Sequence, residues 1–558
     1  MGKENHMHFF IFVLVILFVC FLSSLPFDHL SGQAVAPSLS TTQTSGWSSF
    51  TQAPGSLTIY LSSSGNDNNP CTQTQPCKTL THAKDLIKNN PKPHNSHWVL
   101  LKKGDTFSET LGHWDYGGIS PLQPLLISSY GTGPRPILNT GLSGGLEQCN
   151  APTVVSNLAI VGIHFKSAYT GSGVQWPPTG INLVCGKKAV NWLFEDDIIE
   201  NYKFGMVLQG SSGKNNQNIV IRRSQIRNNG DLVPTSTPDA IAGSGMYVIH
   251  IDGLVLEENL FYHNGWRDGG IKTKFSHNIY LDNENVTNVT VMKNVIADGA
   301  NVGIQLRNGG ILYNNFFMGN QVPISLGGGD SWTDSKHVHV DVRDNVVLNN
   351  INTWGVVFEN IEGGIFFHNL LTHNDVAIAL YVDAFSSDKG KKVKDLRIAN
   401  NIIYDSGKPG NDAVLFGGTQ SSGSILQRIE FSSNDVQLPH VSPQRLLAHQ
   451  DSFLGSAVQS SNNRFFAATN ENTWFWTGSL LTNLAGWKSF VADRSSVATL
   501  VAYPDPNRDT STYMGSLGYA DTSYSNFIAQ LKLQSKDTWK PEFTAPVINA
   551  YIRAGFWQ

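Results

Sequence analysis

Charged residues and cysteines are scarce in this chain, and both shortages limit what it can do. Only 15% of its 558 residues are charged, with 39 Lys and Arg set against 43 Asp and Glu. This balance provides no basic face of the kind that binds nucleic acid, so we expect no nucleic-acid partner. The five cysteines contain no C-x-x-C pair and no Cys/His spacing typical of zinc, so we predict no metal ligands among them. The 52 glycines, with many Asn, Ser and Thr residues, indicate turns and strands rather than helices.

The N-terminal segment resembles an export signal. An apolar run, "FFIFVLVILFVCFLSSL" at residues 9–25, is followed by small residues up to Ala36. The run is long for a cleaved signal and Pro37 would follow the cut, so an uncleaved membrane anchor is the alternative. Either interpretation places the body of the protein outside the cytoplasm, secreted, periplasmic or held at the cell surface. We predict a signal peptide or anchor over residues 1–36 and a Ser/Thr/Gln/Pro-rich linker over 37–55.

Four cysteines lie outside this segment, and an even number in an exported chain indicates disulfides. Cys71 and Cys77 enclose the short polar loop "TQTQP", which makes them the first expected pair. Cys149 and Cys185 then form the second pair by elimination.

A strand–turn–strand unit recurs from about residue 158, as in "GLVLEENLFYHNG", "NVTVMKNVIADG" and "GGILYNNFFMGN". Units of irregular spacing with a constant core are typical of a parallel β-helix, in which short strands stack coil upon coil around one core. An Asn tolerates the left-handed backbone of a tight turn, and its amide can bond to the next coil, so we interpret the Asn column as scaffold. The column comprises Asn259, Asn294, Asn315, Asn345, Asn369, Asn401, Asn434 and Asn463, with Asp197 and Ser224 in the earlier equivalents.

The ends of such a solenoid need covering, because open strand edges pair readily with other chains. Residues 57–90 predict a strand, a Gly/Asn-rich loop and a helix that begins near Thr79. After about residue 466 the repeat is lost, and "SYSNFIAQLKLQSKD" and "APVINAYIRAGFW" have helical apolar spacing. We therefore expect an N-terminal cap with the first coils over 56–157, the β-helix over 158–466, and an irregular C-terminal extension packed on the solenoid over 467–558.

Three features of the sequence point to a known fold: the opening "IYLSSSGNDNNPCTQTQPCKTLTHA", the first coil "LLISSYGTGPRPIL" at 125–138, and the Asn-marked coils. In these features the chain resembles the right-handed parallel β-helix superfamily, the pectin-lyase-like fold. The resemblance covers most of residues 57–466 and implies an all-β, right-handed parallel β-helix with an N-terminal capping helix. Members include polysaccharide lyases, polygalacturonase-type hydrolases, uronate C5-epimerases and non-catalytic adhesins, so the fold alone does not choose an activity. Of the polygalacturonase-type motifs, DD is present at 196–197, whereas NTD, GHG and RIK are absent.

Inserted loops indicate where a binding cleft could lie. Asn259 and Asn294 are 35 residues apart, whereas Asn294 and Asn315 are 21 apart. The longer interval contains "HNGWRDGGIKTKFSH", and the preceding interval from Ser224, also 35 residues, contains "DLVPTSTPDAIAGSG". A long loop beside a nearly bare coil makes a wall beside an open floor, so we predict the cleft here.

Strand alternation predicts the floor of this cleft. In "NIYLDN" the residues Asn278, Tyr280 and Asp282 are expected to face outward, and in "GIQLRN" Gln305 and Arg307 do so. Coils stacked at about 4.8 Å place Tyr280 beside Gln305 and Asp282 beside Arg307. The structural alternative for the two charges is a cross-strand ion pair on a wet surface.

These residue types suit an acidic polysaccharide substrate. A lyase that acts on a uronate must neutralise the carboxylate, remove the adjacent proton and protonate the leaving oxygen. We predict Arg307 for the first task, His277 or Lys274 as the base, Tyr280 as acid or relay, and Asp282 to orient Arg307. A C5-epimerase needs nearly the same set. The predicted substrate contacts are Gln305, His263, Trp266, Arg267 and Lys272.

Two other functions remain open from the sequence. A glycoside hydrolase needs two carboxyl groups across the glycosidic bond, and the candidates are Asp196, Asp197, Asp239, Asp268 and Asp282. A non-catalytic carbohydrate-binding or adhesive solenoid needs neither. We predict no firm cofactor, although Glu195, Asp196 and Asp197 together could hold calcium.

Aromatic residues in or near loops give a separate indication of sugar binding. Residues 112–118 ("GHWDYGG"), Trp176, Trp266, Trp332 and Trp354 could stack on sugar faces, or they could cover the loop bases. We expect the protein to act as a monomer on a polysaccharide, with membrane contact only if the N-terminal segment is uncleaved.

Overall fold

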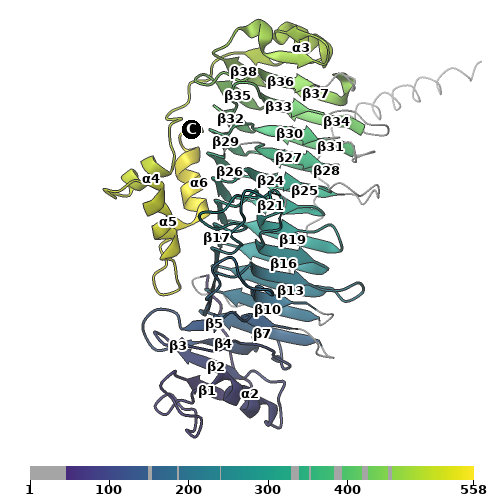
Figure 1. The fold of residues 1–558 in the computed structure, drawn as a ribbon. Coiled ribbons are helices and arrows are strands. Elements are labelled where there is room, and N and C mark those ends of the chain that lie inside the picture. The colour runs from purple at the N-terminus through teal and green to yellow at the C-terminus, as the bar shows by residue number, and fades with distance from the viewer. Residues whose placement is uncertain are drawn as a thin grey trace, which may run out of the picture. The chain divides into compact units, whose positions relative to one another are not determined.

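Three parallel sheets, here called A, B and C, form the body of the protein in the computed structural model (Figure 1). Each full coil contributes one strand to each sheet in turn, and neighbouring strands pair in parallel up to the antiparallel pair β39–β40. The structure describes residues 46–148, 154–184, 188–238, 240–328, 338–350, 354–381, 392–417, 425–449 and 455–557. Residues 1–36, the predicted pair Cys149–Cys185, Asp239 and Trp332 lie outside this part of the chain.

The strands of each sheet follow one another in chain order. Sheet A contains β1 (Thr58–Leu61), β2 (Trp98–Lys102), β4 (Leu125–Tyr130), β7 (Val155–Val161), β10 (Ala189–Glu195), β13 (Asn216–Arg222), β16 (Ile251–Glu257), β19 (Val286–Met292), β22 (Gly309–Tyr313), β25 (His339–Arg343), β28 (Ile361–Phe367), β31 (Lys392–Ala399), β34 (Ile425–Ser432) and β37 (Val458–Ser461). Sheet B contains β3 (Thr106–Phe107), β5 (Ile137–Gly141), β8 (His164–Ser167), β11 (Ile198–Glu200), β14 (Gln225–Arg227), β17 (Leu260–Tyr262), β20 (Val295–Ala297), β23 (Phe316–Met318), β26 (Val346–Leu348), β29 (Leu370–Thr372), β32 (Ile402–Tyr404), β35 (Asp435–Leu438), β38 (Arg464–Ala467) and β41 (Val497–Ala498). Sheet C contains β6 (Leu146–Glu147), β9 (Thr179–Leu183), β12 (Phe204–Gln209), β15 (Ser244–Ile249), β18 (His277–Leu281), β21 (Val302–Leu306), β24 (Val322–Leu326), β27 (Val356–Glu359), β30 (Ile378–Tyr381), β33 (Asp412–Phe416), β36 (Arg445–His449), β39 (Phe475–Thr477) and β40 (Leu481–Thr482).

The N-terminal cap has the predicted helix and disulfide. Helix α2 (Leu80–Lys88) begins after Thr79, whose side chain accepts a hydrogen bond from the backbone N–H of His82. This N-cap satisfies one of the donors that a helix start leaves open. Cys71 and Cys77 form a disulfide in the loop before the helix, which confirms the first expected pair.

The remaining helices lie near the C-terminal end of the chain. Two segments with helical spacing are confirmed as helices α5 (Tyr524–Lys532) and α6 (Ala545–Arg553). The others are α3 (Leu484–Phe490) and α4 (Thr510–Ser516), with the short 3-10 turns η1 (Gly455–Ala457), η2 (Glu471–Thr473) and η3 (Pro541–Phe543). None of the described helices has both the length and the apolar character required to cross a membrane.

A ladder of asparagines runs along the turn between sheets A and B, as the sequence column predicts. From Asn259 to Asn463 each Nδ2 donates to the Oδ1 of the next Asn at 3.0–3.2 Å. The same Oδ1 also accepts from the backbone N–H of the preceding ladder Asn, as Asn345 does from Asn315 at 2.9 Å. The prediction that these Asn residues take the left-handed backbone is wrong, because that conformation belongs to the residue before each of them, such as Glu258 and Lys293.

A second asparagine ladder runs between sheets B and C, and it corrects one prediction for the cleft floor. Asn264 donates to Asn278, which donates to Asn320, at 2.9 and 3.1 Å. Asn278 is therefore fully buried, and the expectation that it faces outward is wrong. In the coil that contains Gly299, this glycine occupies the position at which other coils have the ladder Asn. A Cβ at Gly299 would lie 2.8 Å from Nδ2 of Asn278. Asn278 thus fills the place that Gly299 leaves empty.

Asp197 occupies a ladder position with a carboxyl group in place of an amide. Its Oδ1 accepts from the backbone N–H of Ile163 at 2.8 Å, and its own N–H donates to Ser224. Its Oδ2 is buried without a hydrogen-bond partner. Burial raises the pKa of this carboxyl well above its usual value, so the proton stays on Asp197 under conditions where an exposed Asp is ionised.

Asp197→Asn is expected to stabilise the protein by about 1–2 kcal/mol at pH 7, because the amide is neutral without taking up a proton and its N–H can donate along the ladder. When the pKa of a carboxyl is higher in the folded than in the unfolded state, the free energy of unfolding of the protein falls as pH rises above the unfolded pKa of about 3.9. The gain from the amide should therefore be larger at pH 7 than at pH 4, which urea unfolding at both values measures. Asp268→Asn, at an exposed position, is the control and should change little. An equal gain in stability at both pH values would contradict the raised pKa of Asp197.

Two of the three outer sheet faces are partly covered by other parts of the chain. Helices α5 and α6 pack on sheet B through Phe527, Ile528, Leu531, Ile548 and Ile552, and Figure 1 shows them beside its strands. Residues 46–53, here called the N-terminal strap, lie on part of sheet A. Sheet C is therefore the face to search for a site.

The N-terminal strap is the final part of the predicted linker, and it is docked on the solenoid. Phe50 packs on an apolar stripe of sheet A. The backbone N–H of Ser48 donates to Glu195 at 3.1 Å. The guanidinium of Arg223 lies 4.7 Å from the Trp47 ring and 5.7 Å from the ring of Trp539, so the strap and the segment between α5 and α6 meet just after β13.

Candidate functional site

The predicted cleft floor lies on the outer face of sheet C. Strands β18 and β21 pair with Tyr280 beside Gln305, which confirms the predicted neighbours. Asp282 and Arg307 directly follow these strands in the same register. Ile279 on β18 and Ile304 on β21 are fully buried in the core. Because side chains alternate along a strand, Tyr280, the residue after Ile279, points outward.

Tyr280 is the centre of a stacked group on this face. Its ring lies 5.5 Å from that of Tyr247 on β15, with an interplanar angle of 8°, and 5.2 Å from that of His277, at 17°. The Nε of Arg307 donates to the Tyr280 hydroxyl at 2.9 Å. No other hydrogen bond to the Arg307 side chain occurs within the described ranges, so its two terminal nitrogens can bind a carboxylate.

Asp282 does not take the partner that the sequence predicts. The hydroxyl of Tyr247 donates to Asp282 at 3.1 Å, while Arg307 turns to Tyr280. Asp282 therefore orients Tyr247 rather than Arg307, and the prediction of its role is corrected. Tyr247 was missed from the sequence although it stands in the same outward row, because that row becomes visible only when β15 and β18 are set in register.

His277 is enclosed on this face and neutral. Its Nδ1 is buried without a hydrogen-bond partner. Burial, with a smaller contribution from the positive charge of Arg307, lowers the pKa of His277 to about 3. A buried imidazole with an unused nitrogen next to a cation is the kind of environment that functional sites create.

Three of the predicted substrate-binding residues form a separate group at the corner between sheets B and C. His263 and Lys272 both contact the carboxylate of Asp298, at 3.0 and 2.8 Å. The ring of Trp266 lies 4.2 Å from that of His263, and its Nε1–H donates to the backbone of Asp298. Asp298, which the sequence prediction missed, thus binds the side chains of His263 and Lys272, which were expected to meet substrate.

Arg267 and Lys274 also have contacts of their own. Arg267 donates to the backbone oxygen of Gly230 at 2.7 Å and lies over the ring of Tyr169. Lys274 is exposed, and its ammonium lies 5.0 Å from the ring of Phe275. These contacts of Arg267 and Lys274 are with loop and ring groups outside the stacked group.

The acidic cluster proposed for calcium has its carboxylates bound elsewhere. Glu195 pairs with Arg222 at 2.6 Å and Asp196 with Arg135 at 2.5 Å, while Asp197 belongs to the ladder. These carboxylates do not converge on one cation site. In the described part of the chain, the single close group of metal-ligand residues is Cys71, Cys77 and His82, whose two sulfurs form the disulfide.

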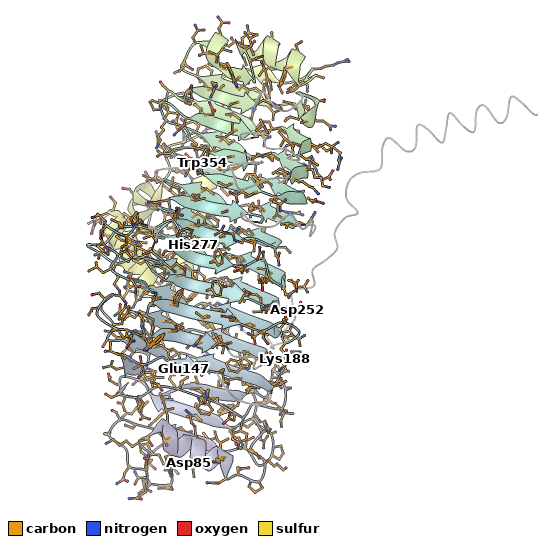
Figure 2. All side chains as sticks on the ribbon, turned by 45° about the vertical axis from the view of Figure 1, so that its right-hand side comes forward. Asp85, Glu147, Lys188, Asp252, His277 and Trp354 are labelled. Atoms are coloured by element: carbon orange, nitrogen blue, oxygen red, sulfur yellow. A yellow bond between two sulfur atoms is a disulfide. The ribbon has the colours of Figure 1, made fainter. Side chains whose placement is uncertain are left out.

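The predicted aromatic residues differ in their exposure. Trp114 of the "GHWDYGG" stretch is buried and donates to the backbone of Leu111, and Trp354 packs on apolar residues of sheet C. Trp176 is 81% exposed. Glu147, His277 and Trp354, labelled in Figure 2, follow one another along the face of the solenoid on which the stacked group lies.

Comparisons with known structures return proteins with similar coils and little sequence identity. A mannuronic acid specific polysaccharide family 6 lyase from human gut microbiota is 13% identical, with a TM-score of 0.43 over 80% of this chain and 92% of that one. The family 6 alginate lyase AlyGC is 14% identical, with a TM-score of 0.47 over 79% of this chain and 57% of that one. A GH136 lacto-N-biosidase from Eubacterium ramulus is 13% identical, with a TM-score of 0.32 over 75% and 68%.

The sequence itself has one family match. No curated protein matches the chain. Residues 156–347 match the family described as "Right handed beta helix region", and this range contains β18 and β21. Together with the three stacked parallel sheets, this match confirms the right-handed parallel β-helix fold expected from the sequence.

Proposed function

We propose that this protein is an exported carbohydrate-active enzyme that abstracts the C5 proton of a uronate unit in an acidic polysaccharide, with β-elimination or C5-epimerisation as the result. The observation that carries the proposal is the 2.9 Å hydrogen bond from Arg307 to the Tyr280 hydroxyl, beside the neutral His277. This pair joins a carboxylate binder to a proton-transfer group on the outer face of sheet C.

Each step of the reaction has a residue of suitable chemistry. The terminal nitrogens of Arg307 bind the uronate carboxylate, which acidifies the C5–H bond. Tyr280 exchanges the proton, because its hydroxyl is held beside the guanidinium that binds the carboxylate. In β-elimination the C5 proton goes to the base, the C4–O bond breaks as a C4–C5 double bond forms, and the leaving oxygen takes up a proton. In epimerisation a proton returns to C5 from the opposite side.

His277 is the second proton-transfer group, and substrate binding adjusts it. With a pKa of about 3 in the free protein, it is a weak base near neutral pH. A bound uronate carboxylate offsets the charge of Arg307, which is one of the causes of this low pKa. The pKa of His277 should therefore rise when substrate binds.

The geometry favours this chemistry over hydrolysis. A hydrolase needs two carboxyl groups on either side of the glycosidic bond. Asp196 and Asp197 are buried in the scaffold, and Asp268 contacts His263 at the corner group. Among the hydrolase candidates in the described ranges, Asp282 is therefore the one that lies near Tyr280, and none of the others can act as the second carboxyl group there.

The disulfide supports the export part of the proposal. Cys71–Cys77 closes the cap loop, and such bonds persist in oxidising compartments. This agrees with the apolar N-terminal segment of the sequence.

A panel of uronate polymers tests the reaction class. We expect either a rise in ultraviolet absorbance from an unsaturated sugar, or deuterium from solvent at C5 without chain cleavage. Reducing ends released without absorbance would instead show a hydrolase, and retention on a polymer without any product would show a binding module. Either of these two results would refute the proposal.

A further inference from the structure

A pocket opens at the N-terminal end of sheet C, outside the stacked group. Its volume is about 490 Å³, and residues of β6 and β9 with the loops before them line it. The lining includes Thr110, Leu142, Glu147, Trp176 and Asn182. A concave site with one large aromatic side chain and a few polar groups is the usual form of a small-ligand site.

Trp176 offers a flat, exposed surface at this pocket. Its side chain is 81% exposed, which is unusual for such a large apolar group. Pro177 and Pro178 follow it and also line the pocket, so the backbone on this side is restricted. An exposed indole at the edge of a pocket can stack against the C–H face of a pyranose ring.

The polar groups of the pocket indicate which sugars it takes. Glu147 and Asn182 are neighbours on adjacent strands, β6 and β9. The Glu147 carboxylate is held over Gly144, where a Cβ would lie 2.6 Å from its Oε1. The lining has this one carboxylate and no Lys, Arg or His. A uronate would meet like charge here, whereas the hydroxyl groups of a neutral sugar can donate to Glu147 and bond to Asn182.

The pocket and the stacked group belong to one row of the sheet. Register pairs connect Glu147 to Asn182, Val207, Tyr247 and Tyr280 in that order. Three coil steps separate Asn182 from Tyr280, which is about 14 Å at the spacing of parallel strands. A short stretch of one polysaccharide chain can therefore span both places.

We propose that the Trp176 pocket is a second sugar-binding site, which takes a neutral unit of the same polymer whose uronate lies at Arg307 and Tyr280. This inference rests on the proposed function and narrows the substrate to a heteropolymer that contains both uronate and neutral sugars. Trp176 supplies the stacking surface, and Glu147 with Asn182 supplies the hydrogen bonds.

Binding without turnover tests this site. Neutral tetrasaccharides of glucose, galactose, mannose or xylose are titrated into the full chain by calorimetry. We expect at least one of them to bind, and Trp176→Ala to raise its Kd by about tenfold through loss of the stacking contact. Glu147→Gln should weaken binding to a smaller extent. Tyr313→Ala, which removes another exposed aromatic side chain on sheet A, is the matched control and should leave Kd unchanged.

The outcomes separate this proposal from the one before it. If no neutral tetrasaccharide binds, or if Trp176→Ala binds as tightly as the unchanged protein, the second site is refuted whatever the activity data show. If Arg307→Ala retains full activity while Trp176→Ala loses neutral-sugar binding, the proposed chemistry fails and the sugar site stands.

Discussion

Arg307→Ala should lower turnover of a uronate polymer by about 10²–10³-fold, the loss typical when one charge-stabilising donor is removed from an active site. The guanidinium holds the Tyr280 hydroxyl at 2.9 Å and keeps its terminal nitrogens for the substrate carboxylate. Its removal takes away both the charge that acidifies the C5–H bond and the donor that positions the Tyr280 hydroxyl. Initial rates on the polymer that gives the largest signal measure this effect.

Two further variants make that result specific. Arg307→Lys keeps the positive charge but loses the planar, two-point contact, so we expect intermediate activity. Arg343→Ala removes an exposed arginine of sheet A that pairs with Asp341, and it should act like the unchanged protein. The thermal midpoint of all three should stay within a few degrees of the original. Full activity of Arg307→Ala with an intact fold would eliminate the site on sheet C.

Asn315→Leu should destabilise the solenoid by about 3–6 kcal/mol, because it leaves several buried polar groups without partners. The Nδ2 of Asn315 donates to the backbone of Val291 and to Asn345, at 2.9 and 3.0 Å. Its Oδ1 accepts from the backbone N–H and the Nδ2 of Asn294, at 2.9 and 3.0 Å. Leucine matches the size of asparagine but can make none of these four bonds. Denaturant unfolding followed by circular dichroism measures the loss.

The control for this substitution is Asn68→Leu in the cap, where the asparagine is exposed. It should change the unfolding midpoint little. An Asn315→Leu protein as stable as the control would show that the ladder is not what holds the turns together. Since each coil contacts mainly its neighbours, the variant should also broaden the transition, as the coils on either side of the defect separate.

Much of the fold could be predicted because its causes are local. The alternation of strands such as β18 and the N-cap Thr79 depend on residues close together in the chain, and the turn asparagines can be recognised because they recur in every coil. The loop between Cys71 and Cys77 is short enough that their pairing is also a local feature. Repetition then extends the local pattern to the whole solenoid.

The errors at the site come from contacts between coils. Asn278 looks like an outward residue of its strand, but Gly299 in the next coil has no side chain, and the amide of Asn278 fills the ladder position that this leaves. Asp282 and Arg307 are neighbours by register, yet they do not pair with each other. Asp282 accepts a hydrogen bond from Tyr247 of β15, and Arg307 donates one to Tyr280 of β18. A single sequence shows which residues share a row, but it does not show which side-chain rotamer each residue adopts or which of several nearby partners it bonds to.

The N-terminal strap determines where mechanical load enters the solenoid. Because Trp47, Arg223 and Trp539 pack together at β13, tension on the chain at residue 46 reaches a middle coil before it reaches the cap. Under such tension the strap would detach from sheet A first, and the apolar stripe of sheet A beneath Phe50 would become exposed. The capped end, where a repeat protein would otherwise unravel coil by coil, is shielded from that force.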